Sequence, residues 1–203
     1  MSDAILPARL RLFIALSLPD GVKDGIEKTQ AELRRALPED CIRWTRREQF
    51  HLTLRFLGNV EAPRAEQLAD SVRGACAGFA ALPLRAEGLG FFPGARSPRV
   101  IWVGVRDGRE QLPLLQQAIE TSVGAFTVEP GEKKFAGHVT LGRVKDLRQS
   151  AAEILQRLAL GVAGRFFGEW TADKVEIIRS ELSPQGLRYT TLAAIPLDAK
   201  SAA

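Results

Sequence analysis

Hydrophobic and polar positions along the chain predict strands and helices in alternation. Alternating apolar residues indicate strands, whereas apolar residues three and four positions apart indicate amphipathic helices. The first half is expected to contain, in order, a strand at residues 9–18, a helix at 20–37, an extended segment at 42–45, a strand at 50–57, a helix from Pro63 to about 76–79 and a strand at 82–92.

The second half repeats this order. It is expected to contain a strand at residues 99–105, a helix from 107–108 to about 123, a strand at 137–144, a helix at about 147–160, and strands at 172–182 and 187–197 joined by a turn. Residues 161–169 mix glycine with aromatic residues and have no clear period. The pattern predicts an α+β protein in which one domain, residues 1–203, consists of two repeat halves at about 9–98 and 99–197.

One short motif occurs once in each half. It reads His51-Leu52-Thr53-Leu54 and then His138-Val139-Thr140-Leu141, and it uses both histidines of the chain. The motifs lie 87 positions apart, close to the spacing of 90 between residues 9 and 99, where the first strands of the halves begin. In a strand, His and Thr share one face. A pseudo-two-fold axis relating the halves would bring both faces together at the lobe interface, where small-molecule sites often lie.

Composition limits the classes of protein to which the chain can belong. Hydrophobic residues make up 45% and charged residues 26% of 203 residues, as in soluble globular proteins. No apolar run approaches the roughly 20 residues of a membrane helix, and residues 1–7 lack the features of a signal peptide. Cys41 and Cys76 have no metal-ligand spacing, so free thiols in a reducing cytoplasm are expected. No coiled coil or apolar helix suggests an oligomer, so a monomer is expected.

The net charge of +4 and the pI of about 9.4 suit a partner that carries phosphates. A solvated basic surface explains the same charge equally well. No GxxxxGK[ST] loop is present, which argues against an ATP-driven enzyme.

Four interpretations of the paired motifs are open. In the first, each histidine is a structural residue. In the second, the histidines bind a metal, although a zinc site usually needs about three or four ligands and neither motif contains a carboxylate. In the third, a histidine activates a nucleophile, although the GxSxG motif is absent. The fourth, which we prefer, is acid–base catalysis on a phosphodiester. One neutral and one protonated imidazole are each worth about 10²–10⁴-fold in rate, and the Thr53 and Thr140 hydroxyls can donate to the phosphoryl oxygens.

A cation near the motifs would strengthen this chemistry. Arg55 and Arg143 follow the first and second histidine by four and five positions. Strict alternation places Arg143 on the wrong face, so Arg143 reaches the phosphate only if the strand ends or twists, which Gly142 permits.

The sequences around the motifs resemble a known family. Residues 51–58, HLTLRFLG, and 138–143, HVTLGR, are similar to the twin H-x-T-x motifs of the two-histidine (2H) phosphoesterases. With RLFIALSLP at 11–19, RVIWVGV at 99–105 and S-P-x-G-x-x-Y at 183–189, the chain resembles the bacterial and archaeal RNA 2',3'-cyclic phosphodiesterases, also named 2'-5' RNA ligases. Gly137 departs from the proline that often precedes the second histidine in this family.

The resemblance implies a bilobal α+β fold in which two antiparallel sheets line a central cleft and helices pack outside. It implies hydrolysis of RNA 2',3'-cyclic phosphate ends to 2'-phosphates without a metal or cofactor, and joining of ends through a 2'-5' linkage by reversal. His51 would be the general acid at the leaving 3'-oxygen, and His138 the general base that activates water. Arg143 matches a phosphate contact of the family.

Aromatic and basic residues suggest further contacts. Phe56, Tyr189 and Trp44 are candidates for stacking on a base, with packing in the core as the alternative for Phe56. A basic rim of Arg46, Arg47, Lys133 and Lys134 is expected to guide RNA, with solvated loop charges as the alternative. Two other functions stay open: a phosphodiesterase for small cyclic nucleotides or 2'-5' oligonucleotides, and an RNA-binding protein without catalysis.

Overall fold

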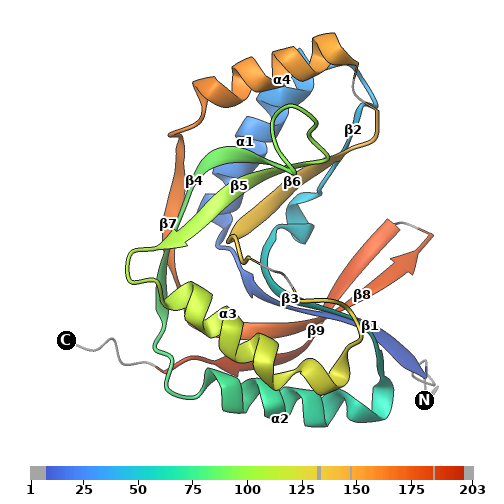
Figure 1. The fold of residues 1–203 in the computed structure, drawn as a ribbon, viewed down its shortest axis with the longest axis vertical. Helices are drawn as coiled ribbons and strands as arrows, with labels where there is room; N and C mark the ends of the chain where they lie inside the picture. Colours follow the sequence, from blue (N-terminus) through green and yellow to red (C-terminus); the bar gives the residue numbers. More distant parts are fainter. Residues whose placement is uncertain (1–7, 132–133, 147, 185, 199–203) are drawn as a thin grey trace.

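Strands and helices of the computed structural model build an α+β fold with two lobes (Figure 1), and the structure describes residues 8–131, 134–146, 148–184 and 186–198. The strands are β1 (Arg9–Ser17), β2 (Ile42–Trp44), β3 (His51–Glu61), β4 (Leu82–Phe92), β5 (Val100–Asp107), β6 (His138–Val144), β7 (Phe166–Ala172), β8 (Lys174–Ser183) and β9 (Gly186–Pro196). The α-helices are α1 (Asp20–Ala36), α2 (Ala65–Cys76), α3 (Gln111–Ser122) and α4 (Gln149–Gly161).

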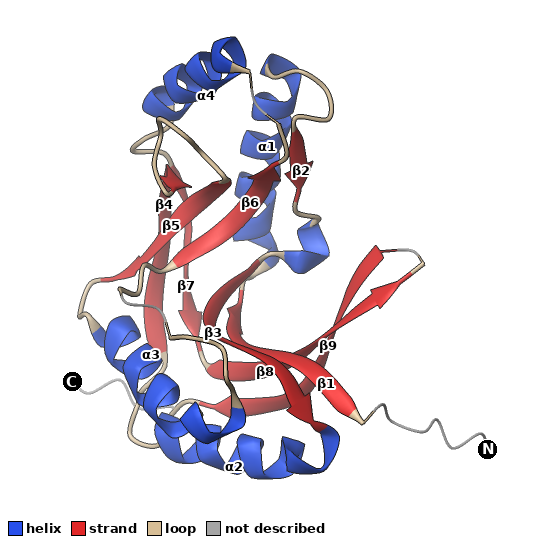
Figure 2. Ribbon diagram, turned by 45° about the vertical axis from the view of Figure 1, so that its right-hand side comes forward, coloured by secondary structure: helices blue, strands red, loops and turns tan. Residues whose placement is uncertain are grey.

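The strands pair antiparallel in the order β7-β4-β5-β6-β3-β1-β8-β9, and β2 pairs with β6. In the described part of the chain, β3 and β6 meet at one residue pair, Leu52 with Val139. The sheet therefore divides there into a β7-β4-β5-β6 half and a β3-β1-β8-β9 half, which diverge from each other (Figure 2). The two expected sheets exist as two arms of one sheet.

The lobes exchange elements between the repeats. α1 and α4 lie on the arm that contains β5 and β6, whereas α2 and α3 lie on the arm that contains β1 and β3 (Figure 1). Each repeat half thus contributes strands and helices to both lobes. Within the described residues, no helix is long and apolar enough to cross a membrane.

Alternation in β1 shows how sequence directs burial. Leu12, Ile14 and Leu16 point into the core and are at most 1% exposed, because strand side chains alternate between faces. On α1, Val22, Ile26 and Leu33 form the buried stripe. Burial of each such side chain contributes about 1.5–3 kcal/mol to stability. Because this face of β1 is held in the core, its opposite face is the one that is turned toward the cleft.

Two elements differ from the expectation, both because of glycine. β3 continues to Glu61 instead of ending at Gly58, where a positive φ of 67° lets the strand bend and continue. β7 occupies a segment that had no assigned element. Gly168, with φ 142°, passes close to Val22 of α1, and a Cβ atom there would lie 2.8 Å from that side chain. Glycine here permits close packing of a strand.

Arg55 lies in the interior instead of the cleft, which corrects its interpretation as a cation near the phosphate. Its side chain is 6% exposed, and its Nη1 and Nη2 donate to the carbonyls of Pro130 and Glu129 at 2.9 and 2.6 Å. Its Nε lies 3.0 Å from Glu120 Oε2, as an ion pair without hydrogen-bond alignment. Arg55 therefore ties the loop before β6 to β3 and α3.

We expect Arg55→Met to lower the free energy of unfolding by about 3 kcal/mol, because Glu120 and two carbonyls lose their partner. Urea unfolding followed by circular dichroism measures this change. Replacing both charges, as in Arg55→Met with Glu120→Leu, should recover part of the loss. A single variant as stable as the wild type would show that the buried pair contributes little.

Candidate active site

A cavity of about 770 Å³ lies between the two arms of the sheet. It is lined by both histidines and by five of the expected substrate contacts, namely Thr53, Phe56, Thr140, Arg143 and Tyr189. Its lining includes three arginines, Arg43, Arg46 and Arg143, and no aspartate or glutamate among the described residues. Such a set of side chains favours an anionic ligand.

A β-bulge in β6 brings Arg143 to the face of the histidine. Thr140 pairs with Trp102 of β5, but Gly142 pairs with the adjacent Ile101, so Leu141 is an extra residue. A bulge of this kind shifts the alternation by one residue. Arg143 consequently shares its face with His138 and Thr140, and the bulge is the irregularity that the sequence pattern required.

The first motif contains the same bulge. Thr53 pairs with Ala15 and Arg55 with the adjacent Ile14, so Leu54 is the extra residue. The shift turns Arg55 to the core and places Phe56 in the cleft, at the position that Arg143 has in the other arm. Phe56 is 49% exposed, which rules out packing in the core as its role.

Both imidazoles are held by the same local hydrogen bond. Nδ1 of His51 lies 2.7 Å from the Gln49 carbonyl, and Nδ1 of His138 lies 2.7 Å from the Ala136 carbonyl. A carbonyl only accepts, so Nδ1 donates in each case. Nε2 is therefore the nitrogen that is free to accept or donate a proton in both rings, and each ring is fixed by the backbone carbonyl two residues before it.

Aromatic rings surround each histidine, and the sequence did not assign a role to most of them. His51 packs against Phe13 at 4.7 Å and edge-to-face against Tyr189 at 5.4 Å between ring centroids. His138 packs edge-to-face against Phe92 at 4.9 Å and lies 6.1 Å from Trp102. Phe13 and Phe92 resemble ordinary apolar strand residues in the sequence. Only the structure shows that Phe92 lines the cleft and that the buried Phe13 packs against the His51 ring.

Gly90 makes space for one of these rings. A Cβ atom at this position would lie 2.2 Å from the Trp102 ring. Trp102 consequently lies against the bare backbone of β4, where its ring supports the His138 imidazole.

Electrostatics distinguish the first histidine. Burial lowers the pKa of His51 to about 4; the bond to the Gln49 carbonyl raises this pKa, and the charge of His138 lowers it further. In the free protein, His51 is therefore neutral at pH 7. Burial also raises the pKa of Tyr189, which the charges of Arg143 and Arg11 lower. Arg143 therefore acts across the cleft on the opposite arm.

The expected basic rim is wrong in one member and unsupported in others. Arg47 makes ion pairs with Asp20, Asp24 and Glu27 of α1 at 3.0, 2.6 and 2.6 Å, so its charge is neutralised outside the cleft. Lys134 is exposed but does not line the cavity, and Lys133 lies outside the described residues.

Arg46 lines the cleft but is already engaged. Its Nε lies 2.9 Å from Glu48, and its Nη2 donates to the Leu187 carbonyl at 2.6 Å. Gln49 donates to the same carbonyl at 2.8 Å. These bonds hold the β8–β9 hairpin, which carries Tyr189, against the entrance of the site. Trp44 also lines the cleft, with the Arg34 guanidinium 5.4 Å from its ring centroid.

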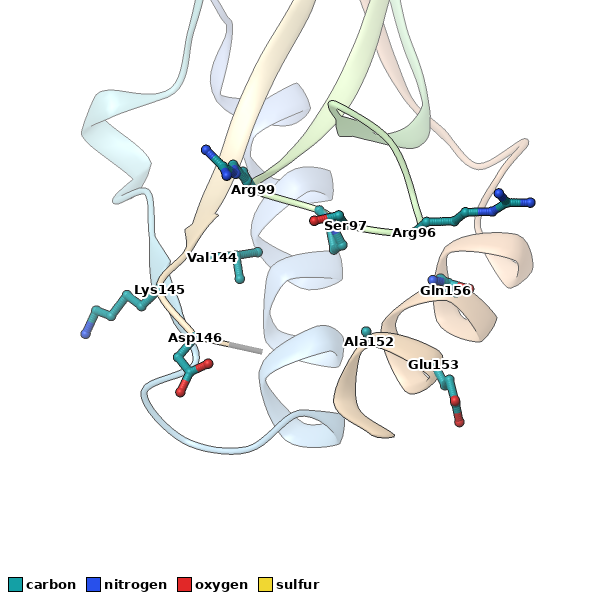
Figure 3. A pocket seen from close by; sticks show the side chains of 10 residues that line it. Arg96, Ser97, Arg99, Val144, Lys145, Asp146, Ala152, Glu153 and Gln156 are labelled. Atoms are coloured by element: carbon teal, nitrogen blue, oxygen red, sulfur yellow. The ribbon is translucent and has the colours of Figure 1, made fainter. Parts of the chain in front are cut away.

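A larger hollow of about 910 Å³ lies away from the histidines, between α4 and the ends of β5 and β6 (Figure 3). Arg96 and Arg99 extend in opposite directions there, and Asp146 and Glu153 add negative charge (Figure 3). Its charged groups do not converge on one point. Among the described residues, no group of three or more His, Cys, Asp or Glu side chains is arranged to hold a metal ion.

Two arms of antiparallel sheet, with one H-x-T motif on each side of a cleft, define a member of the two-histidine (2H) phosphoesterase superfamily. The model of the family described as LigT-like phosphoesterase matches residues 16–102 and again residues 103–189, so the chain belongs to this family. The double match follows the repeat that the sequence shows.

Named relatives agree with this assignment. The chain is 29% identical over 191 residues to the RNA 2',3'-cyclic phosphodiesterase of Methanothermobacter thermautotrophicus, covering 93% of this chain and 100% of the relative. It is 33% identical over 196 residues to that of Thermus thermophilus, covering 93% and 90%. The solved structure of TT0787 from Thermus thermophilus superimposes with a TM-score of 0.75 at 28% identity, covering 93% and 98%. Escherichia coli LigT, complexed with 3'-AMP, shares the fold with a TM-score of 0.74 at 23% identity, covering 93% and 98%.

We expect the His51 ring to titrate near pH 4 in the free protein, and its pKa to rise when inorganic phosphate is added, because a nearby anion favours the charged imidazole. Carbon-detected or proton–carbon NMR of the imidazole Cε1 groups measures this. The chain has two histidines, so the spectrum of His51→Gln assigns both signals. A His51 signal that titrates near its ordinary pKa of about 6.5 without phosphate would contradict the buried ring.

Proposed function

We propose that this protein hydrolyses the 2',3'-cyclic phosphate ends of RNA to 2'-phosphates by acid–base catalysis between His51 and His138. The observation that carries the proposal is the cleft itself: two identically held imidazoles and two threonines face a cavity that is lined by arginine and, among the described residues, lacks carboxylates. The names of the relatives, which are RNA 2',3'-cyclic phosphodiesterases, supply the substrate class.

The proposed step uses each residue once. His138 accepts a proton at Nε2 from a water molecule as the water oxygen attacks phosphorus. The bond between phosphorus and the 3'-oxygen breaks, and His51 donates its Nε2 proton to that oxygen. The product carries a 2'-phosphate and a 3'-hydroxyl. His138 ends the step protonated and His51 neutral, and proton exchange with solvent restores both rings.

Negative charge on the phosphoryl oxygens is stabilised by three groups. The hydroxyls of Thr53 and Thr140 donate to the non-bridging oxygens, and the Arg143 guanidinium provides a positive charge on the same face. Preorganised donors of this kind are worth about 2.7–4 kcal/mol each in other enzymes.

The low pKa of His51 sets a condition on this assignment. An acid must carry a proton when substrate is bound, whereas His51 is neutral at pH 7 in the free protein. The cyclic phosphate is an anion, and its approach favours the protonated imidazole. Substrate binding therefore supplies the charge that keeps the proton on His51.

Phe56 and Tyr189 are proposed to contact the terminal nucleoside. Phe56 exposes half of its surface in the cleft beside Thr53, and Tyr189 lies on the same arm next to His51, so that both rings pack around Phe13. A base that stacks on an exposed ring gains about 1–3 kcal/mol.

If the 5'-hydroxyl of a second RNA end took the place of water, its attack on the cyclic phosphate would break the same bond between phosphorus and the 3'-oxygen and would form a 2'-5' linkage between RNA ends. The same site would accept small cyclic nucleotides if the base pocket alone determined affinity. A protein that only bound RNA would not need two histidines held in the same way. We also propose that the protein is a monomer and that it is cytoplasmic; the two free, buried cysteines support the cytoplasmic location.

We expect the protein to hydrolyse an oligoribonucleotide with a 2',3'-cyclic phosphate end in the presence of EDTA, and ³¹P NMR to show a 2'-phosphate product. His51→Ala and His138→Ala should each lower kcat by about 10²–10⁴-fold, while Arg35→Gln, an exposed arginine of α1 outside the cleft, should match the wild type. Near-normal turnover by either histidine variant would remove the acid–base mechanism. A 3'-phosphate product would reverse the assignment of the leaving oxygen.

We expect Phe56→Ala to raise KM for the oligonucleotide by roughly five- to hundredfold, with a smaller change in kcat, because stacking is worth about 1–3 kcal/mol. Phe166→Ala is the matched control, since Phe166 is 50% exposed but lies on β7 outside the cleft. Steady-state kinetics of both variants measures the difference. Equal effects of the two substitutions would show that Phe56 does not touch the base.

A further inference from the structure

Arg43 lies directly beside Arg143 in the cleft. The two residues are partners in the antiparallel pair of β2 and β6, so their side chains leave the same face of the sheet. Both line the cavity of the histidines. The sequence suggested a role for Arg143 but none for Arg43, because a short extended segment gives no indication of which strand it joins.

The two arginines have no anionic partner in the described part of the chain. Neither of them makes an ion pair there, whereas Arg46, the third arginine of the lining, pairs with Glu48. Like charges directly opposite each other destabilise a strand pair. Negative charge bound near both guanidinium groups removes this repulsion, so the pair is suited to a ligand that carries more than one phosphate.

The position of Arg43 separates it from the reacting phosphate. β3 and β2 lie on the same side of β6, one after the other: Leu52 pairs with Val139, and Arg43 pairs with Arg143. The histidines lie at the first of these positions and Arg43 at the second. In the proposed function, the two histidines, the two threonines and Arg143 contact the reacting phosphate, so Arg43 is available for a second anion farther along the cleft.

We propose that Arg43 binds the phosphate immediately upstream of the terminal nucleoside, attached to its 5'-oxygen, so that the cleft recognises an RNA chain in preference to a mononucleotide. The inference rests on the proposed function for the identity of the first phosphate. A cyclic mononucleotide has one phosphate and leaves Arg43 without a partner. A chain of two or more nucleotides supplies a second phosphate on the 5' side.

The test compares adenosine 2',3'-cyclic phosphate with the dinucleotide ApA that carries a 2',3'-cyclic phosphate. We expect kcat/KM to be higher for the dinucleotide, and the ratio of the two values to fall by roughly ten- to hundredfold in Arg43→Gln, as expected for hydrogen bonds to a charged group. Arg35→Gln should keep the wild-type ratio. A dinucleotide with a neutral methylphosphonate linkage should lose the same factor in the wild type and little more in Arg43→Gln.

The outcomes separate the two proposals. If the ratio is unchanged in Arg43→Gln, or if the methylphosphonate costs nothing, Arg43 does not bind the upstream phosphate. If both substrates lose equally, Arg43 acts at the reacting phosphate or on the fold, and the inference is again overturned. If the wild type hydrolyses neither compound, the proposed function fails, and the ratio of the Kd values of the same two compounds, measured by calorimetry in wild type and Arg43→Gln, decides the role of Arg43.

Discussion

The contact between Leu52 and Val139 is the constraint on which the site depends. Both side chains are fully buried, and they form the one residue pair that joins β3 to β6 in the described part of the chain. A longer ladder would flatten the two arms into a continuous sheet and close the cleft. A missing pair would leave the arms without a fixed distance. Since His51, Thr53, His138 and Thr140 flank this pair in sequence, the contact that joins the lobes also positions the residues proposed to act on the phosphate.

Equal bulges in the two arms turn side chains of different chemistry into the cleft, so the scaffold is symmetric and the site is not. Leu54 and Leu141 are inserted at the same place in the two motifs, so each arm presents a third side chain to the cleft after its His and Thr. One arm presents Phe56 and the other Arg143. A nucleotide is similarly divided, because its base is flat and apolar on its faces while its phosphate is anionic. The repeat therefore accounts for the geometry, and single residue identities account for the chemistry.

The sequence predicted most strands and helices because their periods are strong, and it located both histidines because the motif occurs twice. The prediction failed where the orientation or partner of a residue depends on distant parts of the chain. Arg55 and Arg143 stand at similar distances from their histidines, and only the register with β1 and β5 shows that one faces the core and the other the cleft. Arg47 appeared as a free charge because its partners, on α1, lie at least twenty positions away. The strand β7 was missed because Gly168 weakens its pattern.

The exchange of elements between the lobes affects how the protein acquires its site. β1 is synthesised before both of its neighbours in the sheet, β3 and β8. One edge of β1 consequently waits for β8, which leaves the ribosome after β3 and β6. Contacts between distant parts of a chain form slowly, and an unpaired strand edge invites association with other chains. The wall of the cleft that contains Tyr189 is therefore completed last, and a nascent chain holds both histidines well before it has a closed pocket around them.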